Sequence, residues 1–359
     1  MGLHSRLAAT LALLRRGRRG ASPLLLSARD DDQGRHYAVG YHLDGRQAFA
    51  TEVAQRCHAV VEHPRLPLAL FVARRPGTAC YLLSLPSGQV LQTLEAEPGR
   101  HFYGHGVAHA AGEWFYLTEN DTTDPGRGLL GVYRFDGQRL RREHELPTHG
   151  IGPHEVAWLP CGETLVVANG GIRTEAESRV EMNLHAMAPS LVLMQRDGAL
   201  LSKETLAQPM NSIRHLAIGR DGTVLTCQQY MGAGEDLAEL LAIKRPGQAF
   251  VPFPVAPEQL QGMAHYTASV ALHDELRLVA LTAPRANRLF IWALDSGVLR
   301  LEAHVPDCAG VAAVAEGFVV SSGQGRCRLY DCRAQAVKGT PLALPAGFWD
   351  NHLGVAAAG

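Results

Sequence analysis

Short apolar runs separated by turn dipeptides dominate the pattern of hydrophobic and polar positions along this chain. The runs at 164–168, 289–294 and 317–321 are rich in β-branched and aromatic residues, as strands are. Asp-Gly and Ser-Gly turn signals, such as those at 136–137 and 296–297, lie between them. Helical periodicity is scarce, and its best short candidate is 236–243. This pattern is typical of a β-sandwich, a barrel or a propeller.

A repeat of about fifty residues favours the propeller. Each copy starts with an apolar segment and continues with a turn, a second strand, a variable loop, a third strand and a fourth. The segments begin at 57, 104, 153 and 214, with weaker copies at 267 and 308. The start of the chain has three strands without a first one, whereas 351–355 supplies a single strand at the other end. We therefore predict an all-β, seven-bladed β-propeller over 23–359, closed when the C-terminal strand joins the N-terminal strands.

The first 22 residues are left out of the predicted domain. They are basic, with a short apolar run at 7–14 followed by Arg15 and Arg16. A secretory leader carries its charge before the apolar stretch. The segment is therefore either a leader of uncertain kind, such as a degraded export signal, or a frayed or misassigned, disordered start.

Composition and charge exclude several classes of function. Of the 359 residues 46% are hydrophobic, and 34 basic residues stand against 35 acidic ones, so the chain has no basic footprint for nucleic acid. No apolar stretch approaches the roughly 18 residues of a membrane-spanning helix. The seven cysteines form no CxxC pair, which excludes covalent c-type haem and leaves the redox compartment open. What remains unusual is the number of histidines, 17.

Five of these histidines occupy the same register in five of the seven repeats. The first strand of a blade lines the central channel, so we expect these side chains at one mouth of it, where the loops after the second strands also open. Neutral imidazole binds Zn, Cu, Fe and Ni, and carboxylates beside it favour iron; Glu119, Asp121 and Glu155 are the available acids. The predicted metal ligands are His58, His105, His154, His215, His352, Glu119 and Asp121, and the predicted ligand-binding residues are Asn120, Asn169, Arg173 and Gln228.

Two other roles for the histidines stay open. They could bind a small anion or an organic molecule, or they could latch the ring by hydrogen bonding to neighbouring blades. Because seven first strands surround a wide channel, we expect that opposite histidines cannot reach one ion. A metal site would then use adjacent blades, as in His105 and His154 with Glu119, or a larger ligand such as haem would bridge the mouth.

Several strings together resemble one bacterial family over residues 23–355. They lie at 119–128, 150–155, 167–172, 183–191 and 212–217. Its members are secreted seven-bladed propellers of unknown function, so the resemblance implies a periplasmic location. It also implies genetic association with imelysin-type lipoproteins and a dihaem protein of iron uptake, and it supplies no catalytic residues. This chain departs from the family where Arg15-Arg16 follows the apolar run instead of preceding a longer one.

These observations lead to three functional hypotheses. The first is a non-enzymatic periplasmic binding or accessory protein that takes iron, another transition metal or haem and works with imelysin-type and dihaem partners. The second is a lactonase-like metal-dependent hydrolase, with Glu119, Asn120 and Asn169 around a divalent ion and His154 as general base. The third is a scaffold for protein interactions. The sequence does not specify the oligomeric state.

Overall fold

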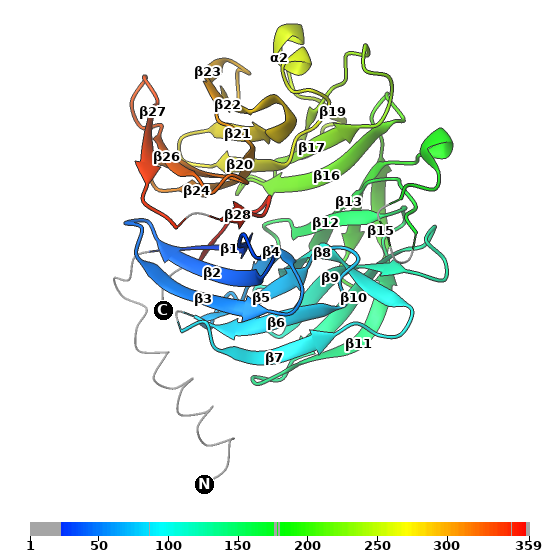
Figure 1. Ribbon diagram of the computed structural model, residues 1–359. Helices are drawn as coiled ribbons and strands as arrows, with labels where there is room; N and C mark the ends of the chain where they lie inside the picture. Colours follow the sequence, from blue (N-terminus) through cyan, green and yellow to red (C-terminus); the bar gives the residue numbers. More distant parts are fainter. Residues whose placement is uncertain (1–22, 86, 176–177, 179, 346, 357–359) are drawn as a thin grey trace.

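Seven antiparallel sheets follow one another around a ring in the computed structural model (Figure 1). The structure describes residues 23–356 except 86, 176–177, 179 and 346, so the interpretation of the first 22 residues lies outside it. Strands dominate this part of the chain, and the helical elements within it are η1 (Leu184–Ala186), α2 (Pro257–Gln261) and η2 (Pro284–Ala286). The predicted seven-bladed propeller is confirmed. No helix of the described residues is long and apolar enough to cross a membrane.

The blades are numbered here from the N-terminus. Blade 1 contains β1 (Leu24–Asp30), β2 (His36–His42) and β3 (Gln47–Val53) together with β28 (Phe348–Trp349) and β29 (Gly354–Ala356). Blade 2 contains β4 (Cys57–Glu62), β5 (Leu68–Ala73), β6 (Ala79–Ser84) and β7 (Val90–Glu95), and blade 3 contains β8 (Arg100–Ala108), β9 (Trp114–Asp121), β10 (Gly128–Phe135) and β11 (Leu140–Pro147). Blade 4 contains β12 (Pro153–Trp158), β13 (Thr164–Asn169), β14 (Ser190–Gln195) and β15 (Leu200–Glu204), and blade 5 contains β16 (Asn211–Ile218), β17 (Val224–Tyr230), β18 (Leu241–Lys244) and β19 (Phe250–Pro252). Blade 6 contains β20 (Ser269–His273), β21 (Leu278–Ala283), β22 (Arg288–Ala293) and β23 (Leu299–His304), and blade 7 contains β24 (Cys308–Val314), β25 (Gly317–Ser322), β26 (Cys327–Asp331) and β27 (Lys338–Leu342).

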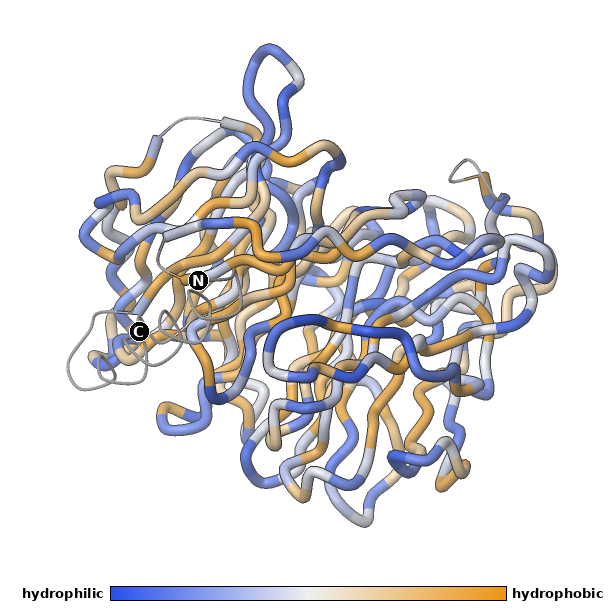
Figure 2. The backbone as a smooth tube through the Cα atoms, turned by 90° about the horizontal axis from the view of Figure 1, so that it is seen from below, coloured by the Kyte–Doolittle hydropathy of each residue, from blue (hydrophilic) through white to orange (hydrophobic). Residues whose placement is uncertain are grey.

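Burial decreases from the second strand of each blade to the fourth. All six residues of β5, β21 and β25 are buried, because both faces of these strands pack against neighbouring blades. The outer strands β7 and β15 are largely exposed. Figure 2 shows the same gradient, with hydrophobic stretches inside the sheets and hydrophilic loops around them. Each large apolar side chain buried in this way stabilises the fold by about 1.5–3 kcal/mol.

The segment 236–243 is not the helix that its periodicity predicts. It runs as turn and extended chain into β18, and Asn211 donates a side-chain hydrogen bond to the carbonyl of Glu239. Ala238 and Leu240 are buried in the core shared by blades 5 and 6. Tertiary packing therefore overrides the weak helical pattern.

The C-terminal strand closes the ring as predicted, but in two pieces. Both β28 and β29 pair with β1, through Arg29 opposite Trp349 and Leu24 opposite Ala356. Residues 350–353 between the two pieces pair with no strand. Closure of the ring therefore places a short irregular segment, which contains His352, at the inner edge of blade 1.

The first strands of most other blades are also irregular at this level. In β12, His154 is an extra residue with no counterpart on the partner strand β13. In β16, Arg214 is the extra residue relative to the partner strand β17. Register shifts also interrupt β4 between Cys57 and Val60, β8 between Phe102 and Gly106, and β24 between Cys308 and Val311. A β-bulge bends its strand and re-aims the side chain at the extra position. In blades 2 to 5 the bulge falls on or next to the repeated histidine.

Candidate metal centre

The five histidines of the shared register converge on one cluster at the centre of the ring. His105 lies in the middle, with its ring centroid 5.0 Å from that of His58, 5.2 Å from His154, 5.2 Å from His215 and 4.6 Å from His352. His215 and His352, from blades 5 and 1, are 4.5 Å apart. We call these five side chains the histidine cluster.

Their convergence shows that the channel is narrower at this level than expected, although each group of three histidines with metal-ligand spacing comes from consecutive blades. The rings of His105, His215 and His352 meet although their blades are not neighbours. The bulges and the broken closing strand carry these side chains inward, and the imidazoles fill the channel at this level. A glycine is required beside them, since a Cβ on Gly104 would lie 2.6 Å from Cδ2 of His58, and Gly104 has φ of +103°.

Two groups of three histidines have the spacing of metal ligands. One is His58, His105 and His352 and the other is His105, His154 and His215; within each group one ring nitrogen per residue lies within 4.8 Å of the others. Nε2 of His105, Nδ1 of His154 and Nε2 of His352 are buried without a hydrogen-bond partner. Buried polar atoms nearly always have a partner, so three such atoms in one cluster make it a candidate ligand site.

Two carboxylates, the buried Asp350 and the partly buried Glu155, orient rings of the cluster. Asp350 Oδ1 lies 2.5 Å from Nδ1 of His58, and Glu155 Oε2 lies 3.0 Å from Nδ1 of His215. In each ring Nε2 then points away from the carboxylate. Carboxylates that hold the second nitrogen of a metal-binding histidine are a common feature of metal sites, where they fix the ring and raise its basicity.

His105, His154, His215 and His352 are neutral at pH 7. Burial is the largest cause that holds the pKa values of His105, His154, His215 and His352 well below the usual range of histidine, and repulsion among the rings adds to it. Burial also raises the pKa of Glu155. Neutral imidazole is the form that binds metal ions, so no proton has to leave these four rings before metal binds.

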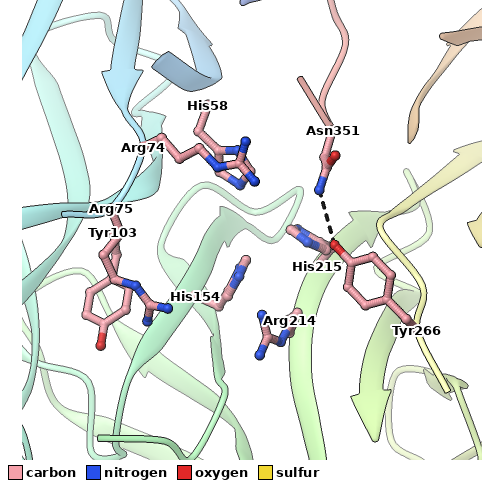
Figure 3. Close-up of a pocket in the computed structure, with 9 residues that line it drawn as sticks. All are labelled: His58, Arg74, Arg75, Tyr103, His154, Arg214, His215, Tyr266 and Asn351. Atoms are coloured by element: carbon pink, nitrogen blue, oxygen red, sulfur yellow. Dashed lines mark hydrogen bonds between the residues drawn. The ribbon is translucent and has the colours of Figure 1, made fainter. Parts of the chain in front are cut away.

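A cavity of about 80 Å³ opens beside the cluster (Figure 3). Its lining consists of imidazole, guanidinium, phenol and amide groups: His58, Arg74, Arg75, Tyr103, His154, Arg214, His215, Tyr266 and Asn351. Asn351 donates a hydrogen bond of 3.1 Å to the Tyr266 hydroxyl. A water needs only about 10–15 Å³ of such space, so the cavity can hold several waters or one small ion with its ligands.

The structure places Glu119 and Asp121 in a separate network within blade 3. Glu119 accepts hydrogen bonds from the Tyr133 hydroxyl at 2.5 Å and from Arg142 at 2.9 Å. Asp121 pairs with Arg100 at 2.9 Å. Glu145 links the arginines, and we call the whole set the Glu119 network: Glu119, Tyr133, Arg142, Glu145, Arg127, Asp121 and Arg100. Neither Glu119 nor Asp121 belongs to a group of described residues with metal-ligand spacing, because arginines already occupy both carboxylates.

The four predicted ligand-binding residues are buried or bonded within their own blades. Asn120 donates to His101 at 3.1 Å, Asn169 donates to the carbonyl of Thr148 at 3.2 Å, and Gln228 donates to Thr226 at 2.5 Å. The backbone N–H of Arg173 donates a hydrogen bond of 2.7 Å to Oδ1 of Asn183. None of the four lines the cavity described above.

The residues that sequence reasoning missed stand next to residues that it found. Asp350 lies two positions before His352, and Arg214 immediately precedes His215. Tyr103 likewise lies two positions before His105. The bulges and the strand break explain the omission, because they turn neighbouring side chains toward the same cavity, whereas a regular strand alternates them between two faces.

Solved structures of low sequence identity share the fold. The periplasmic gluconolactonase PpgL of Pseudomonas aeruginosa aligns with a TM-score of 0.64 at 13% identity, over 94% of this chain and 99% of that chain. Hydrazine synthase of Kuenenia stuttgartiensis aligns with a TM-score of 0.60 at 12% identity, over 92% and 99%. Sqt1 of Saccharomyces cerevisiae gives 0.53 at 12% identity, over 81% and 86%. At such identities the likeness shows the fold alone.

Sequence comparison places the chain in a family. No curated protein matches it by sequence. A family described as "Protein of unknown function (DUF1513)" matches residues 51–356, which include all five residues of the histidine cluster. On the extent of this match, the chain belongs to the DUF1513 family of unknown function.

Proposed function

We propose that this protein binds a transition-metal ion through the histidine cluster. The observation that carries the proposal is the set of three buried, unpartnered imidazole nitrogens within two groups of metal-ligand spacing. A ring latch would use its nitrogens for hydrogen bonds between blades, so these atoms favour a ligand over a latch. His105 belongs to both groups. The five rings could therefore bind one ion through either group, or two ions that share His105 as a ligand.

The imidazole nitrogens of the cluster favour a transition metal of intermediate softness. Imidazole suits Zn, Cu, Fe and Ni. Among the divalent first-row metals, the affinity of such a site increases along the series from Mn²⁺ to Cu²⁺. Iron was favoured for the carboxylates beside the histidines, but Glu119 and Asp121 are held in the Glu119 network. Glu155 and Asp350 remain next to the cluster, where each bonds to an imidazole. Copper and zinc therefore join iron as the ions to test.

A bare ion fits this site better than haem does. Pockets for drug-sized ligands measure about 300–1,000 Å³, whereas this cavity measures about 80 Å³. The role that follows is that of a binding or accessory protein. A periplasmic location and partnership with imelysin-type or dihaem uptake proteins remain part of the proposal, since they rest on the family resemblance alone.

The lactonase-like alternative has less support. The similarity to a periplasmic gluconolactonase extends over nearly the whole chain but at 13% identity. Glu119, Asn120 and Asn169, which were expected to hold its divalent ion, each have a partner inside the protein. A screen of lactones with Mg²⁺, Ca²⁺, Mn²⁺ and Zn²⁺ tests this alternative, and turnover with any of them would revive it.

Elemental mass spectrometry tests the proposed function directly. The purified protein is analysed as isolated and after loading with Fe²⁺, Cu²⁺ or Zn²⁺ and removal of the excess. We expect about one or two equivalents of bound metal, and loss of that metal in the double variant His105→Ala/His154→Ala. The exposed His144, which lies outside the cluster, provides the matched control His144→Ala. Absence of stoichiometric metal in the wild-type protein, or equal loading of the double variant, would refute the proposal.

A further inference from the structure

The lining of the cavity beside the histidine cluster is rich in positive charge. Three arginines line it, and no acidic residue among the described ones does. Asp350, which lies behind the lining, accepts hydrogen bonds from both Arg74 and Arg56 at 3.0 Å, so its single negative charge is already shared.

Arg214 is the least compensated of the three arginines. It forms no ion pair among the described residues, and its Nε is buried without a hydrogen-bond partner. A buried charge without a partner costs several kcal/mol, and a ligand of opposite charge would recover much of that cost.

The neighbouring groups are arranged as hydrogen-bond donors around the same space. Figure 3 shows the guanidinium groups of Arg74, Arg75 and Arg214 on different sides of the cavity, with His154 between them. Arg75 also lies over the Tyr103 ring, 5.1 Å from its centroid, which holds its planar group in place. The oxygen of Tyr266 accepts from Asn351, so its own O–H remains able to donate. Planar guanidinium groups bind carboxylate and phosphate oxygens in pairs.

We propose that this cavity binds a compact oxyanion, a small dicarboxylate or a phosphate, between Arg75, Arg214 and the histidine cluster. Arg214 would pair with the charge of the anion, Arg75 would donate hydrogen bonds to it, and one of its oxygens would complete the set of metal ligands beside the imidazoles. Coordination of the anion to the metal rests on the proposed function, whereas binding of the anion by the arginines does not. The protein would then take its metal together with a small anionic chelator, and bare ions would bind less tightly.

Titration calorimetry with malonate and with inorganic phosphate tests this inference, on metal-free protein and on protein whose metal content has been measured. We expect binding of at least one of the two anions, weakened by salt and tighter when metal is present. In Arg214→Gln the affinity should fall about tenfold to hundredfold, because one charge-assisted hydrogen-bonded contact is lost. Arg139→Gln removes the same charge from the exposed turn between β10 and β11 and should change nothing. Arg75→Gln serves as a second cavity variant if Arg214→Gln does not fold.

The outcomes separate this inference from the proposed function. Binding of malonate alone identifies a dicarboxylate site, and binding of phosphate alone identifies a phosphate site. If metal loads stoichiometrically but neither anion binds, or if the cavity variants bind like the wild type, the inference is wrong and the metal site stands. If an Arg214-dependent anion binds but no metal does, the cavity is an anion site and the proposed function fails.

Discussion

Two polar clusters differ in how their charges are compensated: the Glu119 network lies within blade 3, and the histidine cluster joins side chains from blades 1 to 5. In the Glu119 network each carboxylate meets at least one arginine, and Tyr133 donates a hydrogen bond to Glu119. In the histidine cluster, three ring nitrogens have no partner, and the neighbouring Arg214 forms no ion pair among the described residues. We call the Glu119 network closed because each carboxylate has its cation, although Nε of Arg100 and of Arg142 lacks a partner, and we propose that the open histidine cluster takes a ligand. The following predictions test that distinction.

The largest expected effect is on stability in acid. The pKa values of His105, His154, His215 and His352 are lowered in the folded, metal-free protein, whereas those of the unfolded chain lie near 6.5. Below pH 6.5 the unfolded chain therefore binds more protons, and stability falls as the pH falls, by about 1.4 kcal/mol per pH unit for each histidine and about 5 for all four. Glu155 offsets part of this loss, because its raised pKa lets the folded state take up a proton.

Denaturant unfolding between pH 8 and pH 5 in the presence of a chelator measures this slope. His154→Gln should reduce it by about 1.4 kcal/mol per pH unit. Asp121 and Glu145 of the Glu119 network do not contribute in this range, because their pKa values are lowered and their stabilisation is lost only below about pH 4.5. A slope that His154→Gln leaves unchanged would mean that the cluster is solvated and already titrates normally.

The second prediction breaks the closed network. Arg142→Leu leaves the carboxylate of Glu119, which is 1% exposed, without its cation. Removing one partner of a buried ion pair costs about 3–5 kcal/mol, and Arg142→Leu/Glu119→Leu should recover much of it. The neighbouring Arg141, whose side chain is 71% exposed, gives the control Arg141→Leu with an effect under about 0.5 kcal/mol. Metal loading should be the same in all of these variants, and its loss in Arg142→Leu would return Glu119 to the metal site.

The third prediction adds the ligand to the open cluster. A metal that binds only the folded state, at a free concentration of about 100 times its Kd, should raise the free energy of unfolding by about 2.7 kcal/mol. His105→Leu should abolish this increase, because His105 contributes to both groups of three ligands. Glu119→Gln should keep the increase although it changes the baseline stability. Equal stabilisation of His105→Leu would place the metal elsewhere in the protein.

Sequence periodicity predicted the fold because a propeller repeats its apolar pattern, and the orphan strand at 351–355 indicated how the ring closes. The same register identified the five histidines, since each blade places that position at the axis. Glu155 was named among the available acids, and it bonds to His215. The register could not identify Asp350 or Arg214 as neighbours of the cluster, because strand irregularities decide where those side chains lie. Glu119 was expected at the mouth from its loop, but its side chain lies within the blade against Tyr133.

The smallest effect concerns His105 in the absence of metal, and it separates a ligand site from a ring latch. His105 is 2% exposed, its Nε2 has no partner, and its Nδ1 lies 3.8 Å from Oε2 of Glu155, beyond hydrogen-bond distance. The imidazole therefore contributes little to the metal-free fold, and leucine, which is of similar size, can replace it at small cost. We expect His105→Leu to leave the stability of the metal-free protein within about 1 kcal/mol of the wild type, or slightly above it. Chemical denaturation at pH 8 with a chelator measures this. A loss of more than about 2 kcal/mol would show that the imidazoles hold the blades together, since only a group that makes favourable contacts in the empty protein can be costly to remove.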